Sequence, residues 1–141
     1  MLKRRILSVL LVLTMLVPFA GAAQTAQDNM RGVWVASVAN IDYPSSAGMT
    51  AQALAAEADT MLDNIAAMGL NTVFLQVRPS ADALYRSGLF PQSRYVSGNC
   101  GASPDGDFDV LAYWVEGAHE RGLQLHAWIN PYRITRNGRE E

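Results

Sequence analysis

Residues 69–79, GLNTVFLQVRP, are echoed at residues 122–131 by GLQLHAWINP. In both segments a Gly-Leu pair precedes a short apolar run, and a polar residue followed by proline ends it. Aligned on Pro79 and Pro131, the two segments are 52 residues apart, which places Arg78 opposite Asn130. A strand and a helix that repeat at this spacing are what a parallel sheet with right-handed crossovers requires.

Three apolar segments predict the strands of this sheet. The first covers residues 31–38, is rich in β-branched and aromatic residues, and is followed by the loop signals of residues 40–44. The second covers residues 71–77 and the third residues 123–129, and a proline-containing pair stops each of them. Together with two intervening helices they predict the order strand-helix-strand-helix-strand.

Two amphipathic segments predict the helices. Thr50 and Asp109 are the expected N-caps, while Gly69 and Gly122 lie where C-terminal caps belong. In the first helix apolar residues recur at spacings of three and four: Leu54, Ala58, Met61, Leu62, Ile65 and Met68. The second helix has an apolar face made of Val110, Leu111, Trp114, Val115 and Ala118.

The connection at residues 80–108 is longer than compact domains usually tolerate without a use for it, and we expect a helical turn near residues 81–85. Four acidic residues match positions one, three, five and twelve of a calcium loop: Asp105, Asp107, Asp109 and Glu116. Val110 replaces the glycine of that loop's sharp turn, and the predicted helix already covers it. We therefore expect neither a metal site nor a cofactor.

The 141-residue chain has a formal net charge of -2, but its charge is unevenly distributed. The first 23 residues hold three of the eleven basic residues and no acidic one, and an uncharged run at residues 6–17 precedes small residues up to Ala23. This pattern predicts a signal peptide at residues 1–23, because the run falls short of the roughly 20 residues of a membrane-spanning helix. Residues 24–141 are then secreted or periplasmic, without a stable membrane span.

The exported part has eight basic and thirteen acidic residues, a formal charge of -5. An acidic surface without a basic stripe argues against nucleic acid as a partner. The single cysteine, Cys100, has no internal disulfide partner, so stability has to come from an ordinary core. No lysine follows Lys3, which excludes Schiff-base and P-loop chemistry for this segment.

Strands that are apolar on both faces predict a sheet covered on both sides, as in a (β/α)8 barrel or a doubly wound sheet. In either architecture function collects at the carboxyl ends of the strands. Alternation assigns Val73, Leu75 and Val77, and likewise Leu125, Ala127 and Ile129, to the helix side. The opposite face then carries Phe74, Gln76 and Arg78, together with His126, Trp128 and Asn130.

Arg78 and Asn130 are candidates to hold sugar hydroxyls or a carboxylate, because a guanidinium is a planar fork of donors and an amide both donates and accepts. The alternative is that they cap the strand ends or bind loop backbone. His126 is a candidate proton shuttle or substrate ligand, although a lone strand histidine is more often a satisfied core residue.

Flat aromatic rings suit the apolar faces of sugars. The candidates for such platforms are Trp34, Trp128, Tyr85 and Tyr132; for Trp34 we favour a place in the core, and Tyr132 is the strongest of the four. A glycosidase normally needs two carboxyl groups. Asp42 and Asp82 lie in the loops after the first two strands, from which they could approach such a site. Capping a turn is the commoner use of aspartate there.

Four ordered segments resemble one known family: residues 30–35, residues 74–79 with 82–85, residues 118–123, and residues 126–133. Together they are similar to the glycosyl-hydrolase-like family 10 domain of bacterial envelope proteins. The resemblance implies an α/β fold, of which this chain is the N-terminal part of a (β/α)8 TIM barrel, incomplete at three strands. It also implies hydrolysis of glycosidic bonds, with peptidoglycan glycan strands as a substrate.

In that family we associate catalysis with a pair of adjacent aspartates followed by an aromatic residue at a later strand end, and no such segment occurs in these 141 residues. The resemblance thus implies that the acid and base come from strands beyond this chain, which is expected to be truncated and to fold poorly alone. The residues expected to line the substrate cleft are Arg78, Asp82, Tyr85, His126, Asn130 and Tyr132.

The sequence therefore predicts part of an exported glycoside hydrolase that acts on a cell-wall polysaccharide. A non-catalytic glycan-binding or envelope-scaffolding barrel domain is the alternative from another functional class. A third hypothesis is an exported barrel hydrolase that cleaves amides.

Overall fold

The computed structural model describes residues 29–99, 101 and 108–134. The predicted signal peptide, Cys100 and the aspartates at positions 105 and 107 lie outside the described residues. The elements follow the order β1 (Gly32–Val35), η1 (Val38–Asn40), α2 (Ala51–Ala67), β2 (Thr72–Arg78), α3 (Arg94–Ser97), α4 (Val110–Glu120) and β3 (Gln124–Ile129). Among these residues, no helix is both long and apolar enough to cross a membrane.

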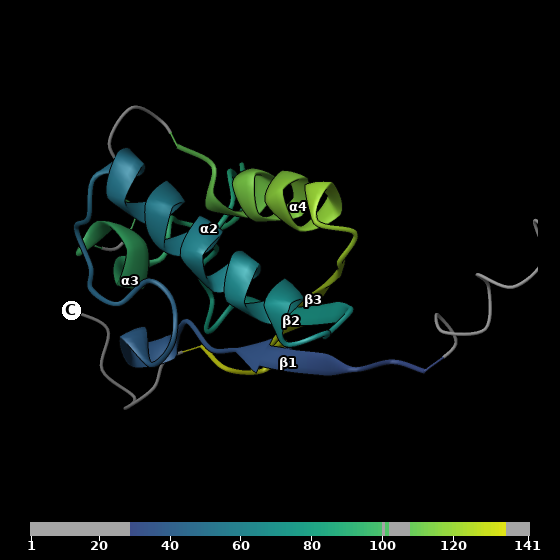
Figure 1. Ribbon diagram of the computed structural model, residues 1–141. Helices are drawn as coiled ribbons and strands as arrows, with labels where there is room; N and C mark the ends of the chain where they lie inside the picture. The colour runs from purple at the N-terminus through teal and green to yellow at the C-terminus, as the bar shows by residue number, and fades with distance from the viewer. Residues whose placement is uncertain (1–28, 100, 102–107, 135–141) are drawn as a thin grey trace, which may run out of the picture.

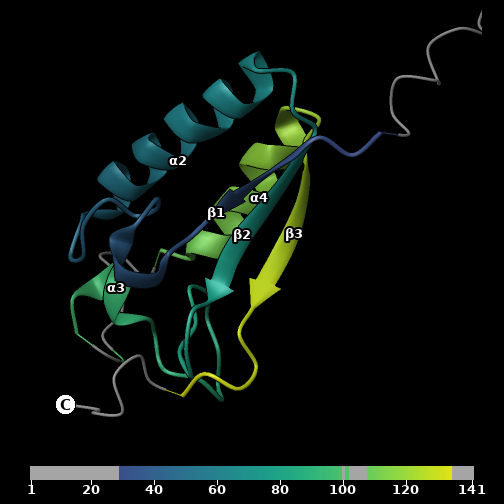
Figure 2. The same ribbon diagram turned by 90° about the horizontal axis from the view of Figure 1, so that it is seen from below.

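The three strands form one parallel sheet in the order β1-β2-β3. Helices α2 and α4 lie side by side on one face of it (Figures 1 and 2). This α/β arrangement confirms the predicted strands, helices and parallel pairing, and it is compatible with part of a TIM-barrel-like domain. The expectation of two covered faces is not met within the described residues, because Trp34 on the other face is 59% exposed.

The core lies between the sheet and the two helices. The β2 residues Val73, Leu75 and Val77 are buried in this core, on the helix side of the sheet, as the alternation of side chains predicted. Helix α2 contributes Leu54, Ala58, Leu62 and Ile65, and α4 contributes Val110, Trp114 and Ala118. The predicted N-caps are confirmed, since the side chains of Thr50 and Asp109 accept hydrogen bonds from the amides of Ala53 and Ala112.

Two of the predicted helix-side residues of the third strand are not covered. Leu125 packs against the core, but Ala127 is exposed and Ile129 is 46% exposed. The reason is that β3 is an edge strand and the helices cover only its start. Met68, predicted on the apolar face of the first helix, is likewise exposed because the helix ends at Ala67.

The first strand is shorter than predicted, ending at Val35 instead of residue 38. The Asp42 carboxylate accepts a hydrogen bond from the amide of Ala36 at 2.8 Å, and the Ala36 carbonyl accepts from the amides of Asp42 and Tyr43. These bonds turn the chain away from the sheet and into the η1 turn.

The helical turn predicted near residues 81–85 is wrong. The Ala83 amide donates to the Pro91 carbonyl, and the Ser93 amide donates to the Ala83 carbonyl, so Ala83 forms a parallel bridge with Gln92 instead. The short helix of this connection is α3, which begins after Ser93. Pairing within the loop thus prevailed over local helix preference.

Candidate functional site at the strand ends

The carboxyl ends of the parallel strands meet at one edge of the sheet, and the connections after β1, β2 and β3 leave from it (Figure 2). Arg78 and Asn130 lie together there, as the repeat predicted. The backbone amide of Asn130 donates to the backbone carbonyl of Arg78 at 3.0 Å. Farther along, the Ala81 amide donates to the Ile134 carbonyl at 3.4 Å, so the connections after β2 and β3 also touch.

Aromatic rings line the sheet face that the helices leave uncovered. Trp34 stacks on Phe74 with ring centroids 4.5 Å apart, and Trp128 meets Trp34 edge-on at 5.3 Å. The ring of His126 lies 5.1 Å from that of Phe74, and its side chain is exposed. The alternation of β2 and β3 is therefore as predicted, whereas the core position favoured for Trp34 is wrong in this structure.

The Arg78 side chain is half-buried and rests on an aromatic ring. Its guanidinium carbon lies 3.6 Å from the centroid of Phe90, an arrangement that favours a cation electrostatically. Within the described residues the guanidinium forms no hydrogen bond or ion pair, and its Nε is buried without a partner. The strand end thus presents a positive group that no carboxylate of the described chain neutralises.

The Asn130 side chain forms two hydrogen bonds within the chain. Its side-chain oxygen accepts from the Trp128 indole at 3.1 Å, and its side-chain amide donates to the Pro79 carbonyl at 3.1 Å. The side chain therefore holds the Trp128 ring and ties the two strand ends, a role that matches the strand-end capping alternative.

The two candidate carboxylates hold loops in place. Asp82 is 6% exposed; its two oxygens accept from the Ser93 hydroxyl at 2.6 Å and the Ser80 amide at 3.0 Å. Asp42 is exposed and accepts from the amide of Ala36. Both therefore have the turn-stabilising use that is common for aspartate. Neither is paired with a second carboxyl group among the described residues.

Tyr85 and Tyr132 lie in different surroundings. Tyr85 is half-buried and lines a pocket of about 310 Å³ in the connection after β2, whose walls also include Phe90 and Gln92. Tyr132 follows β3 and is 96% exposed. The ring of Tyr132 is thus accessible, while that of Tyr85 belongs to a concave surface.

Gln76 has a role that the sequence analysis did not assign. It is fully buried, and its side-chain oxygen accepts from the amides of Ser37 and Val38 at 3.0 and 2.9 Å. The Ser37 hydroxyl returns a hydrogen bond to the Gln76 carbonyl at 2.8 Å. These bonds fasten the connection after β1 to β2. The sequence signal that could have revealed this role is a polar residue within a strand of otherwise apolar, buried residues.

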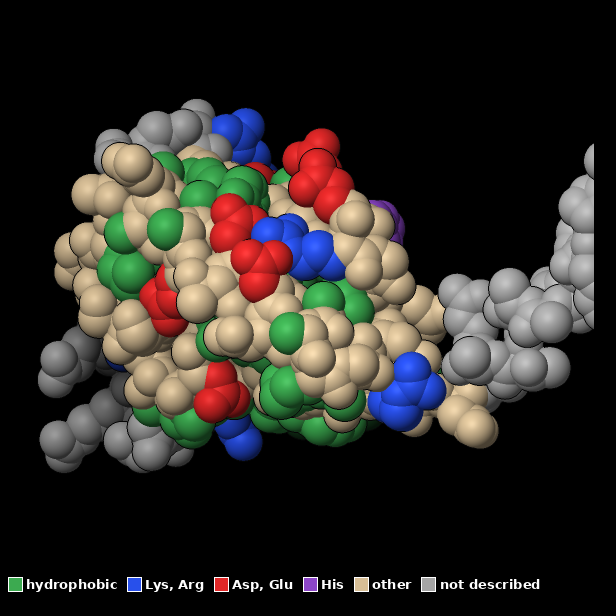
Figure 3. Space-filling model, viewed as in Figure 1, with side chains coloured by type: hydrophobic (Ala, Val, Ile, Leu, Met, Phe, Trp, Pro, Cys, Tyr) green, Lys and Arg blue, Asp and Glu red, His purple; other side chains and the backbone are tan. Residues whose placement is uncertain are grey.

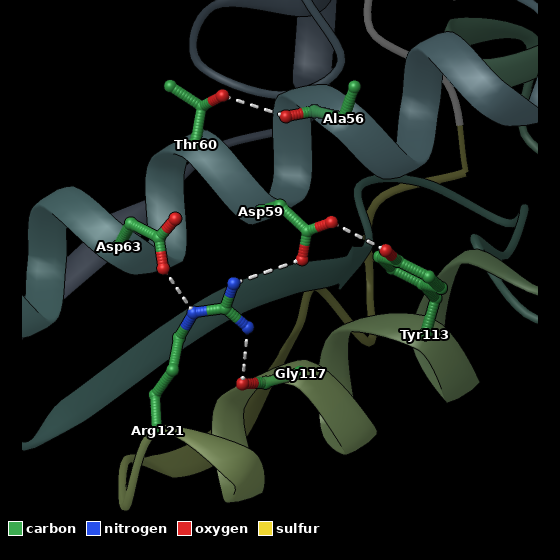
Figure 4. A network of polar contacts seen from close by, with 7 residues as sticks. All are labelled: Ala56, Asp59, Thr60, Asp63, Tyr113, Gly117 and Arg121. Atoms are coloured by element: carbon green, nitrogen blue, oxygen red, sulfur yellow. Dashed lines mark hydrogen bonds and ion pairs between the residues drawn. The ribbon is translucent and has the colours of Figure 1, made fainter.

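The helix side of the molecule carries an ion network that joins α2 to α4. Arg121 contacts Asp59 at 3.1 Å and Asp63 at 2.7 Å, and the Tyr113 hydroxyl donates to Asp59 at 2.7 Å (Figure 4). In the space-filling view, basic atoms lie between acidic ones near the middle of this face (Figure 3). The bond to Asp63 raises the pKa of Arg121, and the bond to Asp59 raises that of Tyr113.

This network faces away from the strand ends, so we assign it to stability. Its charged groups lie on the helix layer, where Arg121 forms ion pairs with Asp59 and Asp63. Among the described residues, no group of three or more His, Cys, Asp or Glu side chains is placed to hold a metal ion. Asp109, one of the four acidic residues considered for calcium, caps α4 and accepts from the Arg86 amide.

Comparison with known families gives the site its context. A sequence model of the family described as Glycosyl hydrolase-like 10 matches residues 29–141. The chain belongs to this family. The resemblance found in the sequence motifs is thereby confirmed, and all the strand-end residues described above lie within the matched region.

Two relatives are named glycosyl hydrolases. The chain is 45% identical to glycosyl hydrolase YngK of Bacillus subtilis (strain 168) over 121 residues, covering 86% of this chain and 23% of the relative. It is 35% identical to glycosyl hydrolase DigH of Escherichia coli (strain K12) over 136 residues, covering 88% of this chain and 30% of the relative. The chain thus spans less than a third of the length of either glycosyl hydrolase.

Proposed function

We propose that the chain is part of an exported glycoside hydrolase that cleaves glycosidic bonds in a cell-wall polysaccharide, with peptidoglycan glycan strands as the first substrate to test. Membership of the Glycosyl hydrolase-like 10 family and two relatives named glycosyl hydrolases support the reaction class. The polysaccharide and the location rest on the predicted signal peptide at residues 1–23 and on the family resemblance.

The observation that carries the proposal is the junction of Arg78 and Asn130 at the carboxyl ends of neighbouring strands. Ligand sites in parallel α/β folds collect at this edge, because the loops open there. The half-buried guanidinium and the accessible ring of Tyr132 supply the two kinds of contact that a sugar needs, hydrogen-bond donors and an apolar plane.

The sheet belongs, in this proposal, to a (β/α)8 barrel of which residues 24–141 form the N-terminal portion. Parallel strands in sequential order, with α2 and α4 on one face of the sheet, support this interpretation. The uncovered face with Trp34 is then turned toward the barrel axis, and further strands continue the sheet. The catalytic acid and base come from those strands.

The proposed cleft residues differ in what they offer. Arg78 and His126 present polar groups on the uncovered face, and Tyr132 and Tyr85 present rings. Asn130 and Asp82 act mainly by fixing the strand end and the loop, since their side-chain oxygens already accept hydrogen bonds. Substrate contact by these six residues is part of the proposal.

A non-catalytic glycan-binding domain is the second candidate. Its motivation is that Asp42 and Asp82 are engaged in loop hydrogen bonds, so glycoside hydrolysis by the usual route would need both of its carboxyl groups from the further strands. In this case the strand ends bind sugar without cleaving it.

The test uses purified peptidoglycan glycan strands without stem peptides, incubated with a protein that contains this chain together with the further strands proposed to supply the acid and base. Mass spectrometry of the soluble products detects cleavage, and co-sedimentation with the strands detects binding. Shorter saccharides with a new reducing end, formed by addition of water across the glycosidic bond, support the hydrolase. Binding without such products supports the second candidate. Absence of both overturns the two candidates together.

Export is tested separately, with residues 1–23 fused to a reporter that is active only outside the cytoplasm. Reporter activity that depends on the basic residues at positions 3–5 is the expected result. A fusion that stays inactive contradicts the proposed location and leaves the reaction class unaffected.

A further inference from the structure

The guanidinium of Arg78 is a positive charge without an anion in the described chain. It is half-buried over Phe90, its Nε is buried without a partner, and no ion pair or hydrogen bond to its side chain is present among the described residues. Burying a charge is costly unless it is paired, and contact with a ring compensates only in part. An anion that pairs with this guanidinium would therefore be bound favourably.

The acidic residue that follows β2, Asp82, is held by other contacts. Its two oxygens accept from Ser93 and Ser80. Asn130 is also committed, to Trp128 and Pro79. Arg78 therefore has side-chain donors left for a ligand at this edge.

The neighbourhood of Arg78 points to an acceptor-rich ligand. Gln76 precedes it on the same face of β2, and the Gln76 side-chain amide is buried without an acceptor. Phe90 both carries the guanidinium and lines the 310 Å³ pocket with Tyr85 and Gln92, and the Gln92 side-chain amide also lacks a partner. The Arg78 guanidinium thus lies beside a residue of the pocket wall, Phe90, and the nitrogens of Gln76 and Gln92 are further buried donors without a partner.

We propose that Arg78 is a specificity-determining residue that pairs with a carboxylate carried by the substrate sugar. This inference rests on the proposed function, because it assigns one recognition contact within the same glycan site. A planar carboxylate matches the fork of donors of a guanidinium, and the guanidinium carbon of Arg78 already lies 3.6 Å from the centroid of Phe90. A neutral sugar leaves the charge unpaired and binds more weakly.

Sugar carboxylates have two common chemical sources, a lactyl ether on an amino sugar and the C6 acid of a uronic acid. The experiment compares matched pairs on the full chain: N-acetylmuramic acid against N-acetylglucosamine, and glucuronic acid against glucose. Binding is measured by calorimetry and by the NMR signal of the Arg78 Nε–H group. The pair that shows the larger difference identifies the source.

The acidic sugar is expected to bind about tenfold or more tightly than its neutral partner, which is typical of a hydrogen-bonded charge pair. It is also expected to shift the Arg78 Nε–H signal. Arg78→Gln abolishes the preference, and Arg78→Lys retains part of it, because lysine keeps the charge and loses the fork. Arg94→Gln, which removes an exposed arginine of α3, is the matched control and keeps the preference.

Equal binding of acidic and neutral sugars by the wild-type chain, or an unchanged preference in Arg78→Gln, overturns the assignment. Circular dichroism checks the fold of each variant, and if Arg78→Gln does not fold, the wild-type sugar pairs and Arg78→Lys decide. The readout needs no hydrolysis. If a protein that contains the further strands prefers acidic sugars but releases no products, the hydrolase is refuted and the carboxylate contact stands.

Discussion

The Asn130 amide donates a hydrogen bond to the Arg78 carbonyl at 3.0 Å, while the Asn130 side chain donates to the adjacent Pro79 carbonyl at 3.1 Å. The two bonds continue the pairing of β2 and β3 past Ile129, the last paired residue of β3. They hold the start of both connections at one edge, so side chains from segments 52 residues apart in the sequence reach the same place.

Replacing Asn130 by Asp tests this junction. The change keeps an acceptor for the Trp128 indole but removes the donor to the carbonyl of buried Pro79. We expect a loss of about 1–3 kcal/mol in the free energy of unfolding, because a buried acceptor is left unpaired. Urea unfolding measures it. Asn99→Asp, at an exposed position, controls for the added charge, and an equal loss in both variants contradicts the structural role.

Asp109 is expected to matter more than an ordinary N-cap. One of its oxygens caps α4 at the Ala112 amide, and the other accepts from the Arg86 amide in the connection after β2. Asp109→Ala is expected to cost about 1–2 kcal/mol, and Thr50→Ala, which removes a single cap bond, about 1 kcal/mol or less. Chemical denaturation of both variants gives the comparison. A smaller loss for Asp109→Ala is the contrary result.

Alkaline pH is expected to weaken the contact between α2 and α4. The hydrogen bond to Asp59 raises the pKa of Tyr113 above its ordinary value, and burial adds to this. The stabilisation is therefore complete below about pH 10, the unfolded pKa, and is lost as the pH rises through the higher folded pKa.

Tyr113→Phe removes this titration. Its free energy of unfolding is expected to decline less steeply than that of the wild type above pH 10. Urea melts over a pH series measure both slopes. Tyr43, whose pKa burial also raises, is present in both proteins and does not affect the difference. Parallel slopes show that the Tyr113–Asp59 bond has no influence on stability.

Gly117 lies where α4 crosses α2 closely. A Cβ at this position comes within 3.0 Å of Leu62 Cδ1 and 3.3 Å of a terminal nitrogen of Arg121. Gly117→Val is expected to destabilise the fold by about 1–3 kcal/mol through overpacking. Ala112→Val, at an exposed position of the same helix, controls for helix propensity. Thermal unfolding distinguishes them, and similar melting temperatures argue against close helix packing.

Much of the secondary structure was predictable because its causes are local. Thr50 and Asp109 cap helices by accepting from amides three residues away, and Gly69 and Gly122 adopt positive φ at helix ends. The first strand was predicted too long because the bond that ends it, from the Ala36 amide to Asp42, competes with sheet pairing. A propensity scale contains no information about that competition.

The candidate site was only partly predictable. The repeat placed Arg78 near Asn130 correctly, because the backbone amide of Asn130 donates to the Arg78 carbonyl. The 52-residue register itself shifts after Gln76, where Arg78 pairs with Ile129. The hydrogen bonds of Asp82 to Ser93 and of Gln76 to Ser37 were not foreseen. These contacts join a strand to a long connection, whose path depends on pairing such as that of Ala83 with Gln92.

The order of residues alone was sufficient for the family, the strand-helix alternation and the face on which each β2 side chain lies, because these follow from motifs and from the two-residue period of a strand. Three-dimensional contacts decided which of the candidate groups are free. Asp82, Asn130 and Arg78 are all polar residues at one strand end, yet neighbours satisfy the first two and leave the guanidinium on Phe90 without an anion. Hydrogen-bond satisfaction depends on distances between remote segments, which a linear pattern does not contain.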